Sequence, residues 1–428
     1  MIKRKVGTIT LAAGLIAAGG LWLAQNFTDI AMKEVLKYWP ILLIGLGIEM
    51  IVYMVIQNAD NGNTKIGVDG LAIAFIIIVA VISSGVSFIN LDFPFEFKID
   101  GNTIIDGVRY DTQIRENFSK ENISSAYGVN TVRVDNTMGQ VKILPSDGSS
   151  IKIEAVVSVK CNDEAKAKEY AKEAIVISEG TTTEISTKNP TDAQKKDFAR
   201  AMIDYVIYVP KTAKVEIDEK FGNVQVEGIN ANVEVDNKYG ETKIYDIDGD
   251  VTLNSSFGSI ELEDISGKTV VDNKNGKITA KNISTAELET SFGSIEAEDI
   301  NGDLTANSKN GKVSAKNVSG RTELESSFGS IKAEDIEGNL VARSNNGSIE
   351  AYNIKGDAKL KTSFGSIKIE SDSLDNCTLT AETSMGSIDT DRAFNVKKSG
   401  SRVTAEGKTG NGQYSIELET SNGSIEIR

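Results

Sequence analysis

The 428-residue chain contains no histidine and only two cysteines. Without histidine it cannot form a Ser-His-Asp or Cys-His catalytic group or a histidine-ligated metal site. Cys161 and Cys377 are far apart in the sequence and too few for a disulfide framework, so we expect both to be free thiols. We therefore predict no catalytic residues, no cofactor and no metal, and a protein that is not an enzyme.

Positive charge is also scarce. The chain has 46 basic and 61 acidic side chains, which give a net charge of −15, and its first 89 residues are close to neutral. The acidic charge is therefore concentrated after residue 89. An acidic region of this kind argues against binding to nucleic acid and against electrostatic docking on anionic lipid.

Long apolar runs stand out near the N-terminus, at residues 6–24, 38–56 and 66–89. Each is long enough for a helix that crosses a bilayer, so we predict a region of three transmembrane helices at 1–89. A Lys-Arg-Lys cluster at 3–5 favours a cytoplasmic N-terminus, which places the rest of the chain outside. Glu49 lies within the second run. An intramembrane carboxyl group is a functional candidate by default, although we favour a structural role here.

The remainder of the chain repeats one short phrase. Ser-Phe-Gly-Ser-Ile occurs at 256–260, 291–295, 327–331 and 363–367, and Asn-Gly phrases alternate with it. A fixed period of 18 residues, with one step of 17, indicates stacked repeat units. Sharp corners favour positive φ, so we expect left-handed backbone at the turn glycines. These glycines are Gly222, Gly240, Gly258, Gly276, Gly293, Gly311, Gly329, Gly347 and Gly365.

Each repeat contains two stretches in which apolar and polar residues alternate, as at 251–254 and 260–263. This alternation is typical of half-buried strands. Two short strands cannot bury a core alone, whereas stacked coils can. We therefore predict an all-β ectodomain, with a β-solenoid of about 12 coils at residues 215–428, each coil having 18 residues and two short strands. Glu and Lys alternate between coils on one exposed face, and we expect this pattern to fix the register.

Two further regions flank the repeats on the N-terminal side. Residues 90–127 are polar and turn-rich, and we interpret them as a juxtamembrane tether. Residues 128–214 are less regular, with helices predicted at 163–174 and 191–203 and strands at 175–178 and 184–187. We interpret this region as a small α+β cap on the solenoid.

At the C-terminus a final phrase, at 421–425, comes just before the chain stops. This arrangement predicts an open strand edge at the end of the rod, which invites pairing with another chain. Either the turn-rich segment at 397–412 folds over the end as a cap, or the end contacts a partner or a second copy. We favour the cap.

Four aromatic residues recur at one corner of every second coil, Phe257, Phe292, Phe328 and Phe364. Pointing outward, they would form a widely spaced aromatic row suited to a glycan or a peptide. Pointing inward, they would plug the corner of the solenoid. We favour the inward orientation because the adjacent Ser and Gly leave space for a ring.

Two segments carry a resemblance to known bacterial families. Asp-Tyr-Val-Ile-Tyr-Val-Pro-Lys at 204–211, followed by Ala-Lys-Val-Glu-Ile at 213–217 and Phe-Gly-Asn-Val at 221–224, resembles the entry to the repeats of the "putative adhesin" β-strand-repeat family, a domain of unknown function. This resemblance covers roughly residues 128–428. Tyr-Trp-Pro-Ile-Leu-Leu-Ile-Gly-Leu-Gly at 38–47 resembles the Lia-type membrane proteins, which are linked to sensing damage to the bacterial cell envelope. Neither family brings catalytic residues.

Two functions follow as hypotheses, both in the bacterial cytoplasmic membrane with the ectodomain outside. In the first, the protein is a non-enzymatic, membrane-anchored surface protein whose solenoid is an adhesin-like or envelope-binding scaffold for a protein or a cell-wall polymer. In the second, it is a regulatory membrane protein of the envelope-stress response that acts through a membrane signalling partner. The sequence leaves the choice between them, and the oligomeric state, open.

Overall fold

The computed structural model describes residues 3–6, 65–68, 97–99, 102–105, 108–124 and 128–428. The chain divides into two units, Met1–Phe95 and Glu96–Arg428. In the first unit, β1 (Lys3–Val6) pairs in parallel with β2 (Lys65–Val68). Glu49 and the three expected spans lie outside the described residues, apart from residues 6 and 66–68. Within the described ranges, no helix has the length and apolarity needed to cross a bilayer.

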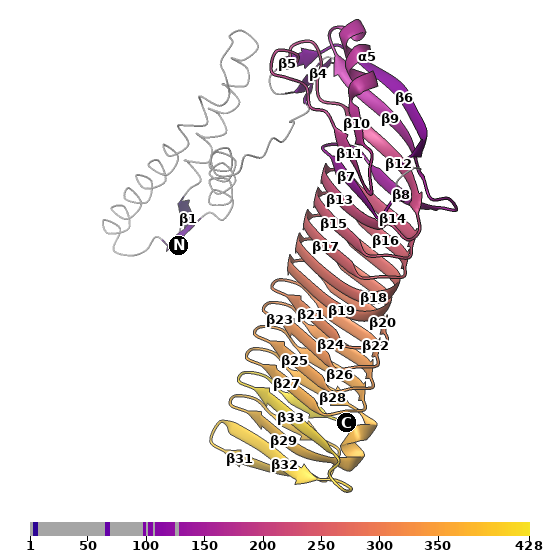
Figure 1. Cartoon of the computed structure of the whole chain (residues 1–428). Coiled ribbons are helices and arrows are strands. Elements are labelled where there is room, and N and C mark those ends of the chain that lie inside the picture. Colours follow the sequence, from indigo (N-terminus) through magenta and orange to yellow (C-terminus); the bar gives the residue numbers. More distant parts are fainter. Residues whose placement is uncertain (1–2, 7–64, 69–96, 100–101, 106–107, 125–127) are drawn as a thin grey trace. The chain divides into compact units, whose positions relative to one another are not determined.

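The second unit is dominated by coils that stack along one axis (Figure 1). In each coil, one strand leads into a glycine turn and a second strand leaves it, so the strands form two series. We call these series the upstream sheet and the downstream sheet. Each strand pairs in parallel with the equivalent strand of the next coil, as Val233 of β15 does with Val251 of β17. The prediction of a mostly β ectodomain built from stacked two-strand coils is confirmed.

The upstream sheet follows the order in space β11 (Thr182–Thr187), β7 (Thr131–Asn136), β13 (Lys214–Phe221), β15 (Val233–Tyr239), β17 (Val251–Phe257), the second parts of β18 (Ile260–Asn275) and β19 (Ile278–Phe292), β21 (Leu304–Ser308), β23 (Thr322–Ser326), β25 (Leu340–Ser344), β27 (Ala358–Thr362), β33 (Tyr414–Thr420) and β29 (Cys377–Thr383).

The downstream sheet follows the order β12 (Met202–Pro210), β8 (Val141–Ser146), β14 (Val224–Ile229), β16 (Thr242–Ile247), the first parts of β18 and β19, β20 (Ile295–Ile300), β22 (Val313–Val318), β24 (Ile331–Ile336), β26 (Ile349–Ile354), β28 (Ile367–Glu370), β34 (Ile425–Ile427) and β30 (Ile388–Thr390).

The core lies between the two sheets and follows from the alternation in the sequence. Val251, Leu253, Ile260 and Leu262 are all at most 1% exposed, because every second residue of a strand points to the same face. On the outer face of the downstream sheet, register places Glu263, Lys281, Glu298 and Lys316 side by side in successive coils. Alternating charges at this position place opposite rather than like charges next to each other in adjacent coils, which avoids repulsion in this register.

The N-terminal end of this unit is an α+β cap. Helix α5 (Glu164–Glu173) begins where the Asp163 side chain accepts a hydrogen bond from the Lys166 backbone N–H, and β10 (Ile175–Ser178) follows it. The second predicted helix is wrong. Residues 192–197 form turns, because Phe198 must reach inward to stack on Tyr170, with ring centroids 4.5 Å apart.

Part of the expected tether is also folded. Strand β6 (Thr112–Ile123) pairs antiparallel with β9 (Ile151–Cys161), which in turn pairs antiparallel with β12. Before it, β3 (Phe97–Ile99), β4 (Asn102–Ile105) and β5 (Val108–Tyr110) form a small antiparallel sheet. The cap therefore begins earlier in the sequence than we expected.

The C-terminal end differs most from expectation. Strand β33 lies between β27 and β29, and β34 lies between β28 and β30, so the final phrase is enclosed rather than terminal. After the 3₁₀ helix η1 (Asp372–Asn376), the chain makes the outermost coil, β29 and β30, before it returns. The expected open edge at the last phrase is wrong.

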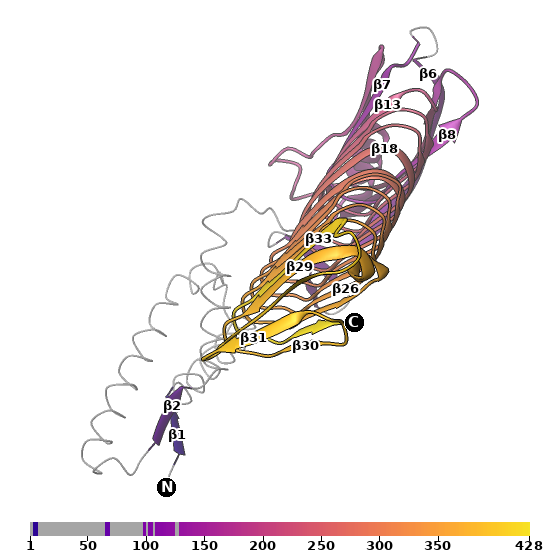
Figure 2. The same cartoon turned by 90° about the horizontal axis from the view of Figure 1, so that it is seen from below.

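A hairpin covers the β29 edge of the outermost coil instead. Strands β31 (Asn395–Ser399) and β32 (Arg402–Lys408) pair antiparallel, and β32 pairs antiparallel with β29. Figure 2 shows β29, β30 and β31 together at this end. The segment at 397–412 is therefore a cap, as we expected, but it is largely a β-hairpin rather than a loop.

Candidate functional site

The phrase glycines stack on one another at the turn between the two sheets. A Cβ atom added to Gly329 would lie 1.9 Å from the carbonyl oxygen of Gly311, and one added to Gly311 would lie 1.8 Å from that of Gly293. Over all nine phrase glycines this distance is 1.4–2.1 Å, far inside ordinary contact. Glycine is needed here because the backbones of adjacent coils approach each other too closely for any side chain.

The backbone angles at these turns are not all left-handed. φ is 147–148° at Gly240, Gly258 and Gly276, but Gly222 and the phrase glycines from Gly293 onward have φ outside the left-handed region. The expectation of positive φ is therefore wrong for Gly222 and for the later coils. There, close approach of the backbones is the reason for glycine.

The left-handed residues lie at the other corner, which the sequence analysis missed. Asp or Asn occupies this corner in seven successive coils, with φ between 50° and 57°. Asn and Asp tolerate this conformation better than other non-glycine residues. Asparagine amides also donate to the aspartate of the preceding coil, as Asn317 does to Asp299 at 2.6 Å. The signal was an Asx residue six positions after seven of the nine phrase glycines: Asp246, Asp264, Asn282, Asp299, Asn317, Asp335 and Asn353.

Buried hydroxyl groups satisfy the carbonyls of the stacked glycines. Ser326 Oγ donates to Gly311 O at 3.0 Å, and Ser344 Oγ donates to Gly329 O at 3.2 Å. Equivalent bonds come from Ser308, Thr362, Thr420 and Thr383. A buried carbonyl without a partner would be costly, so this row explains why a polar residue recurs inside the solenoid.

The four corner aromatics point outward. Their exposed fractions are 47% for Phe257, 60% for Phe292, 68% for Phe328 and 62% for Phe364. The expectation that they plug the corner is wrong. The inner side of this corner is already filled by the stacked glycines and the buried hydroxyl row, and coils ~4.8 Å apart leave no room for a ring.

These rings form one edge of the solenoid, which we call the aromatic edge. At its N-terminal end, Phe221, Tyr239 and Phe257 stack with centroids 5.1 Å apart and ring planes within 5° of parallel. Beyond Phe257 an asparagine replaces every second ring. The Asn275, Asn310 and Asn346 amides donate to serine carbonyls of the preceding coil at 3.1–3.2 Å.

Lysines flank the aromatic edge in two of the asparagine coils. They are Lys274 and Lys277 on either side of one phrase, and Lys309 and Lys312 on either side of the next; all four are exposed. Lys277 pairs with Glu296 at 2.6 Å. Within residues 128–428, the other three form no ion pair. The Asn-Gly-Lys phrases are visible in the sequence, but only the structure shows that such a phrase lies in register between exposed rings, as Asn275 does between Phe257 and Phe292.

A buried carboxyl group lies at the junction of cap and solenoid. Glu219 is fully buried, accepts a hydrogen bond from Asn136 Nδ2 at 2.8 Å and another from the Phe221 backbone N–H at 3.0 Å. Burial raises the pKa of Glu219 to about 8, although these two donors oppose the shift. Glu219 occupies the same inward row as the hydroxyl groups, so it serves the interior of the solenoid rather than its surface.

The other chemically reactive groups in the described part of the chain are buried or dispersed. Cys161 and Cys377 are both free and buried, as we expected, and burial raises the pKa of each thiol. Such thiols are poor nucleophiles at neutral pH. Among the described residues, no cluster of three or more acidic, histidine or cysteine side chains could hold a metal ion.

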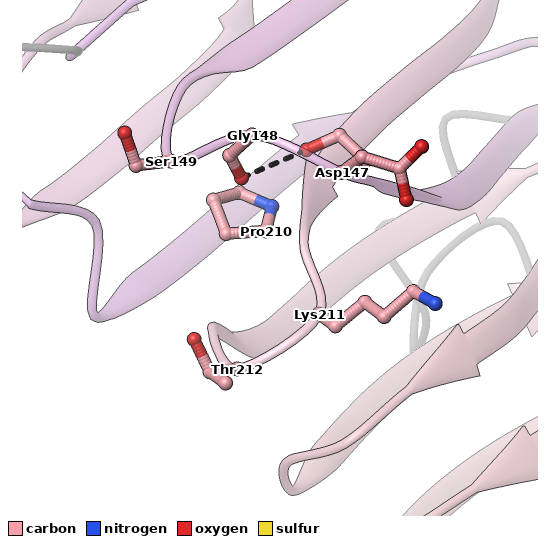
Figure 3. A pocket seen from close by; sticks show the side chains of 7 residues that line it. Asp147, Gly148, Ser149, Pro210, Lys211 and Thr212 are labelled. Carbon is pink, nitrogen blue, oxygen red and sulfur yellow. Dashed lines mark hydrogen bonds between the residues drawn. The ribbon is translucent and has the colours of Figure 1, made fainter.

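A shallow polar depression of about 470 Å³ lies between two turns of the cap (Figure 3). Asp147, Gly148 and Ser149 line one side, and Pro210, Lys211 and Thr212 line the other. Ser146 Oγ donates to Gly148 O at 3.3 Å, so the hydroxyl of one lining residue is already used within its own turn. The depression is small and open, and it brings together no reactive groups.

Two protein families match parts of the chain: a LiaI-LiaF-like transmembrane region at residues 9–51, and the Toastrack domain DUF4097 at residues 270–428. Both parts of the resemblance noted in the sequence are therefore confirmed. No curated protein matches. Solved structures are also similar to the chain, and the low TM-scores of the two described next carry no argument about function.

The first is described as a "putative cell adhesion protein" from Clostridium sporogenes; it is 12% identical over 73% of this chain and 99% of its own, with a TM-score of 0.19. The second is described as a "putative adhesin" from Bacteroides fragilis; it is 14% identical over 74% of this chain and 98% of its own, with a TM-score of 0.23.

Proposed function

We propose that this protein is a non-enzymatic surface protein whose solenoid binds a ligand of the bacterial envelope. Its LiaI-LiaF-like transmembrane region and its Toastrack domain support this proposal. The observation that carries this proposal is the aromatic edge. Four phenylalanines, each about half exposed or more, lie in register along one edge of a regular rod. Large exposed apolar rows are uncommon on soluble surfaces and typically mark binding sites.

The arrangement in the membrane belongs to the same proposal. Residues 1–89 would cross the membrane three times with the N-terminus inside, and the solenoid would lie outside, within reach of the wall. Protease added to intact, wall-stripped cells should then remove the solenoid. Protection of the solenoid would reverse this topology.

Binding can be tested with the full-length protein in lipid nanodiscs and insoluble cell-wall sacculi. We expect the wild type to sediment with the sacculi and the variant F292S/F328S/F364S to remain in solution. V176S/V396S is the matched control, because Val176 and Val396 are 46% and 43% exposed but lie away from the edge. Equal sedimentation of the triple variant and the wild type would refute binding through the aromatic edge.

The LiaI-LiaF-like region favours a second function, regulation of the envelope-stress response through a membrane partner. In that case residues 1–89 alone should co-purify with a membrane protein, and deletion of the gene should change the expression of stress genes. Unchanged expression together with the absence of a co-purifying protein would exclude this function. The two functions are compatible if the membrane region transmits ligand binding by the solenoid to the membrane partner.

A further inference from the structure

Between residues 256 and 330 the chemistry of the aromatic edge repeats every two coils, whereas the backbone repeats every coil. Ser-Phe-Gly-Ser at 256–259, 291–294 and 327–330 alternates with Lys-Asn-Gly-Lys at 274–277 and 309–312. Because strands lie ~4.8 Å apart, one exposed ring and one pair of cations recur about every 9.6 Å. A surface with this two-part period fits a linear polymer whose repeating unit has one apolar face and one anionic group.

The charge of the edge is opposite to that of the chain as a whole. The chain carries a net charge of −15, yet the phrases from 256–259 to 327–330 contain four lysines and no carboxylate side chain. Three of these lysines form no ion pair within residues 128–428, so their charges are available to a ligand. An anionic ligand would be repelled by most of this protein and attracted along this edge.

Sugar rings fit the aromatic part of the repeat. The C–H face of a pyranose packs on an aromatic ring, and the serine hydroxyls beside each phenylalanine can hydrogen-bond to sugar hydroxyl groups. In an extended β-1,4-linked chain each sugar is turned over relative to the last, so every second sugar presents the same face. The length of one such disaccharide is close to two strand spacings, which is the spacing of Phe257, Phe292 and Phe328.

We propose that the aromatic edge binds an extended β-1,4-linked glycan in which every second sugar carries a carboxylate. Phe257, Phe292 and Phe328 stack on the uncharged sugars, and the lysine pairs at 274/277 and 309/312 contact the carboxylates between them. This inference rests on the proposed function and specifies its ligand. Each contact is weak and open to solvent, so affinity comes from many repeats engaged at once.

Other occupants fit less well. An extended peptide advances ~3.3 Å per residue and alternates its faces, so the same face does not return at about 9.6 Å. A polyproline helix does have three residues per ~9.3 Å turn, but it is neutral and leaves the lysine pairs without a partner. Two copies of this chain would bring together two strongly acidic molecules.

The test uses full-length protein in nanodiscs and fluorescent, peptide-free glycan chains of increasing length, each sugar pair bearing one carboxylate. We expect affinity to rise with each added disaccharide until three or four are present, and to fall with added salt. K309S/K312S should weaken binding about three- to tenfold and reduce the salt dependence, because exposed ion pairs contribute little individually. K397S/K398S removes the same charge from exposed positions away from the edge and should bind like the wild type.

Each outcome distinguishes this inference from the broader proposal. If K309S/K312S binds like K397S/K398S, or a neutral glycan of equal length binds as tightly, the anionic glycan is the wrong ligand, although binding of sacculi through the phenylalanines would still stand. If a proline-rich peptide binds more tightly than the glycan, the ligand is a peptide. If F292S/F328S converts a dimer to a monomer in sedimentation and leaves glycan binding unchanged, the edge is a self-association surface and the inference is overturned.

Discussion

A single added methyl group at a stacked turn should disrupt the solenoid more than a strained backbone angle does. The substitution is Gly329→Ala. Its Cβ atom would lie 1.9 Å from Gly311 O and 2.9 Å from the Lys312 backbone nitrogen. Both are main-chain atoms of the adjacent coil, so no side chain can rotate away, and the two coils must separate by more than 1 Å at this corner.

The size of the destabilisation by Gly329→Ala follows from the hydrogen bonds at the same corner. Separation would weaken the bonds from Ser326 Oγ to Gly311 O, from Ser344 Oγ to Gly329 O and from the Phe328 N–H to Lys309 O. Buried groups that lose their partners cost about 1–3 kcal/mol each. Replacing Gly by Ala regains about 0.4–1 kcal/mol from the lower entropy of the unfolded chain. Losing all three partners would cost about 3–9 kcal/mol, but the bonds are weakened rather than broken, so we expect a net loss of roughly 2–5 kcal/mol in the free energy of unfolding.

Gly400→Ala is the matched control. Gly400 has φ of +63° and nothing within 4 Å of its added Cβ, so this variant has backbone strain without a clash. A left-handed alanine costs about 1–2 kcal/mol, and part of that is offset in the unfolded chain. Gly400→Ala should therefore be clearly less destabilising than Gly329→Ala.

Urea unfolding followed by far-ultraviolet circular dichroism is the appropriate assay. Both tryptophans of the chain, Trp22 and Trp39, precede the second unit, so tryptophan fluorescence would not report on the solenoid. Hydrogen exchange should also rise in the coils next to Gly329, because each repeat contacts only its neighbours. If Gly329→Ala is no more destabilising than Gly400→Ala, close packing of the turns is not why these positions are glycine.

Three further predictions test other parts of the fold. The pKa of Glu219 in the folded protein is about 8 and exceeds its ordinary value of 4.5, so its contribution to stability is complete below pH 4.5 and is lost as pH rises through 8. The free energy of unfolding of Glu219→Gln should therefore rise relative to that of the wild type by up to about 1.4 kcal/mol per pH unit in that window. A difference between the two proteins that is the same at pH 5 and pH 8 would contradict this. Ser344→Ala removes a donor to Gly329 O and an acceptor from the Gly347 N–H, and should cost about 1–3 kcal/mol by urea unfolding; a change under 0.5 kcal/mol would show that water replaces the hydroxyl. Deleting Asn395–Lys408 uncovers the edge of β29, so we expect the variant to self-associate, as measured by size-exclusion chromatography. A variant that stays monomeric would show that the hairpin does not protect this edge.

Local patterns predicted the repeating part of the molecule well. The alternation at 251–254 and 260–263, repeated every 18 residues, was enough to place the strands and the buried residues, because stacking identical units leaves few ways to bury their apolar faces. The helix at Glu164–Glu173 was also visible, since Asp163 is a good N-cap and alanines follow it. The lysines at the phrase Asn-Gly-Lys were visible but had no evident role until their neighbours in space were known.

The orientation of the phenylalanines could not be read from their spacing. The sequence determined that one ring recurs every second coil, but a ring beside Ser and Gly can turn either way in an isolated turn. The stacking of adjacent coils decided it, because glycine backbones in close contact and a row of buried hydroxyl groups fill the inner side and force the rings out. The same holds at the C-terminus. The final phrase looks terminal in the chain, and its place between β27 and β29 arises only from long-range strand pairing, which local sequence cannot specify.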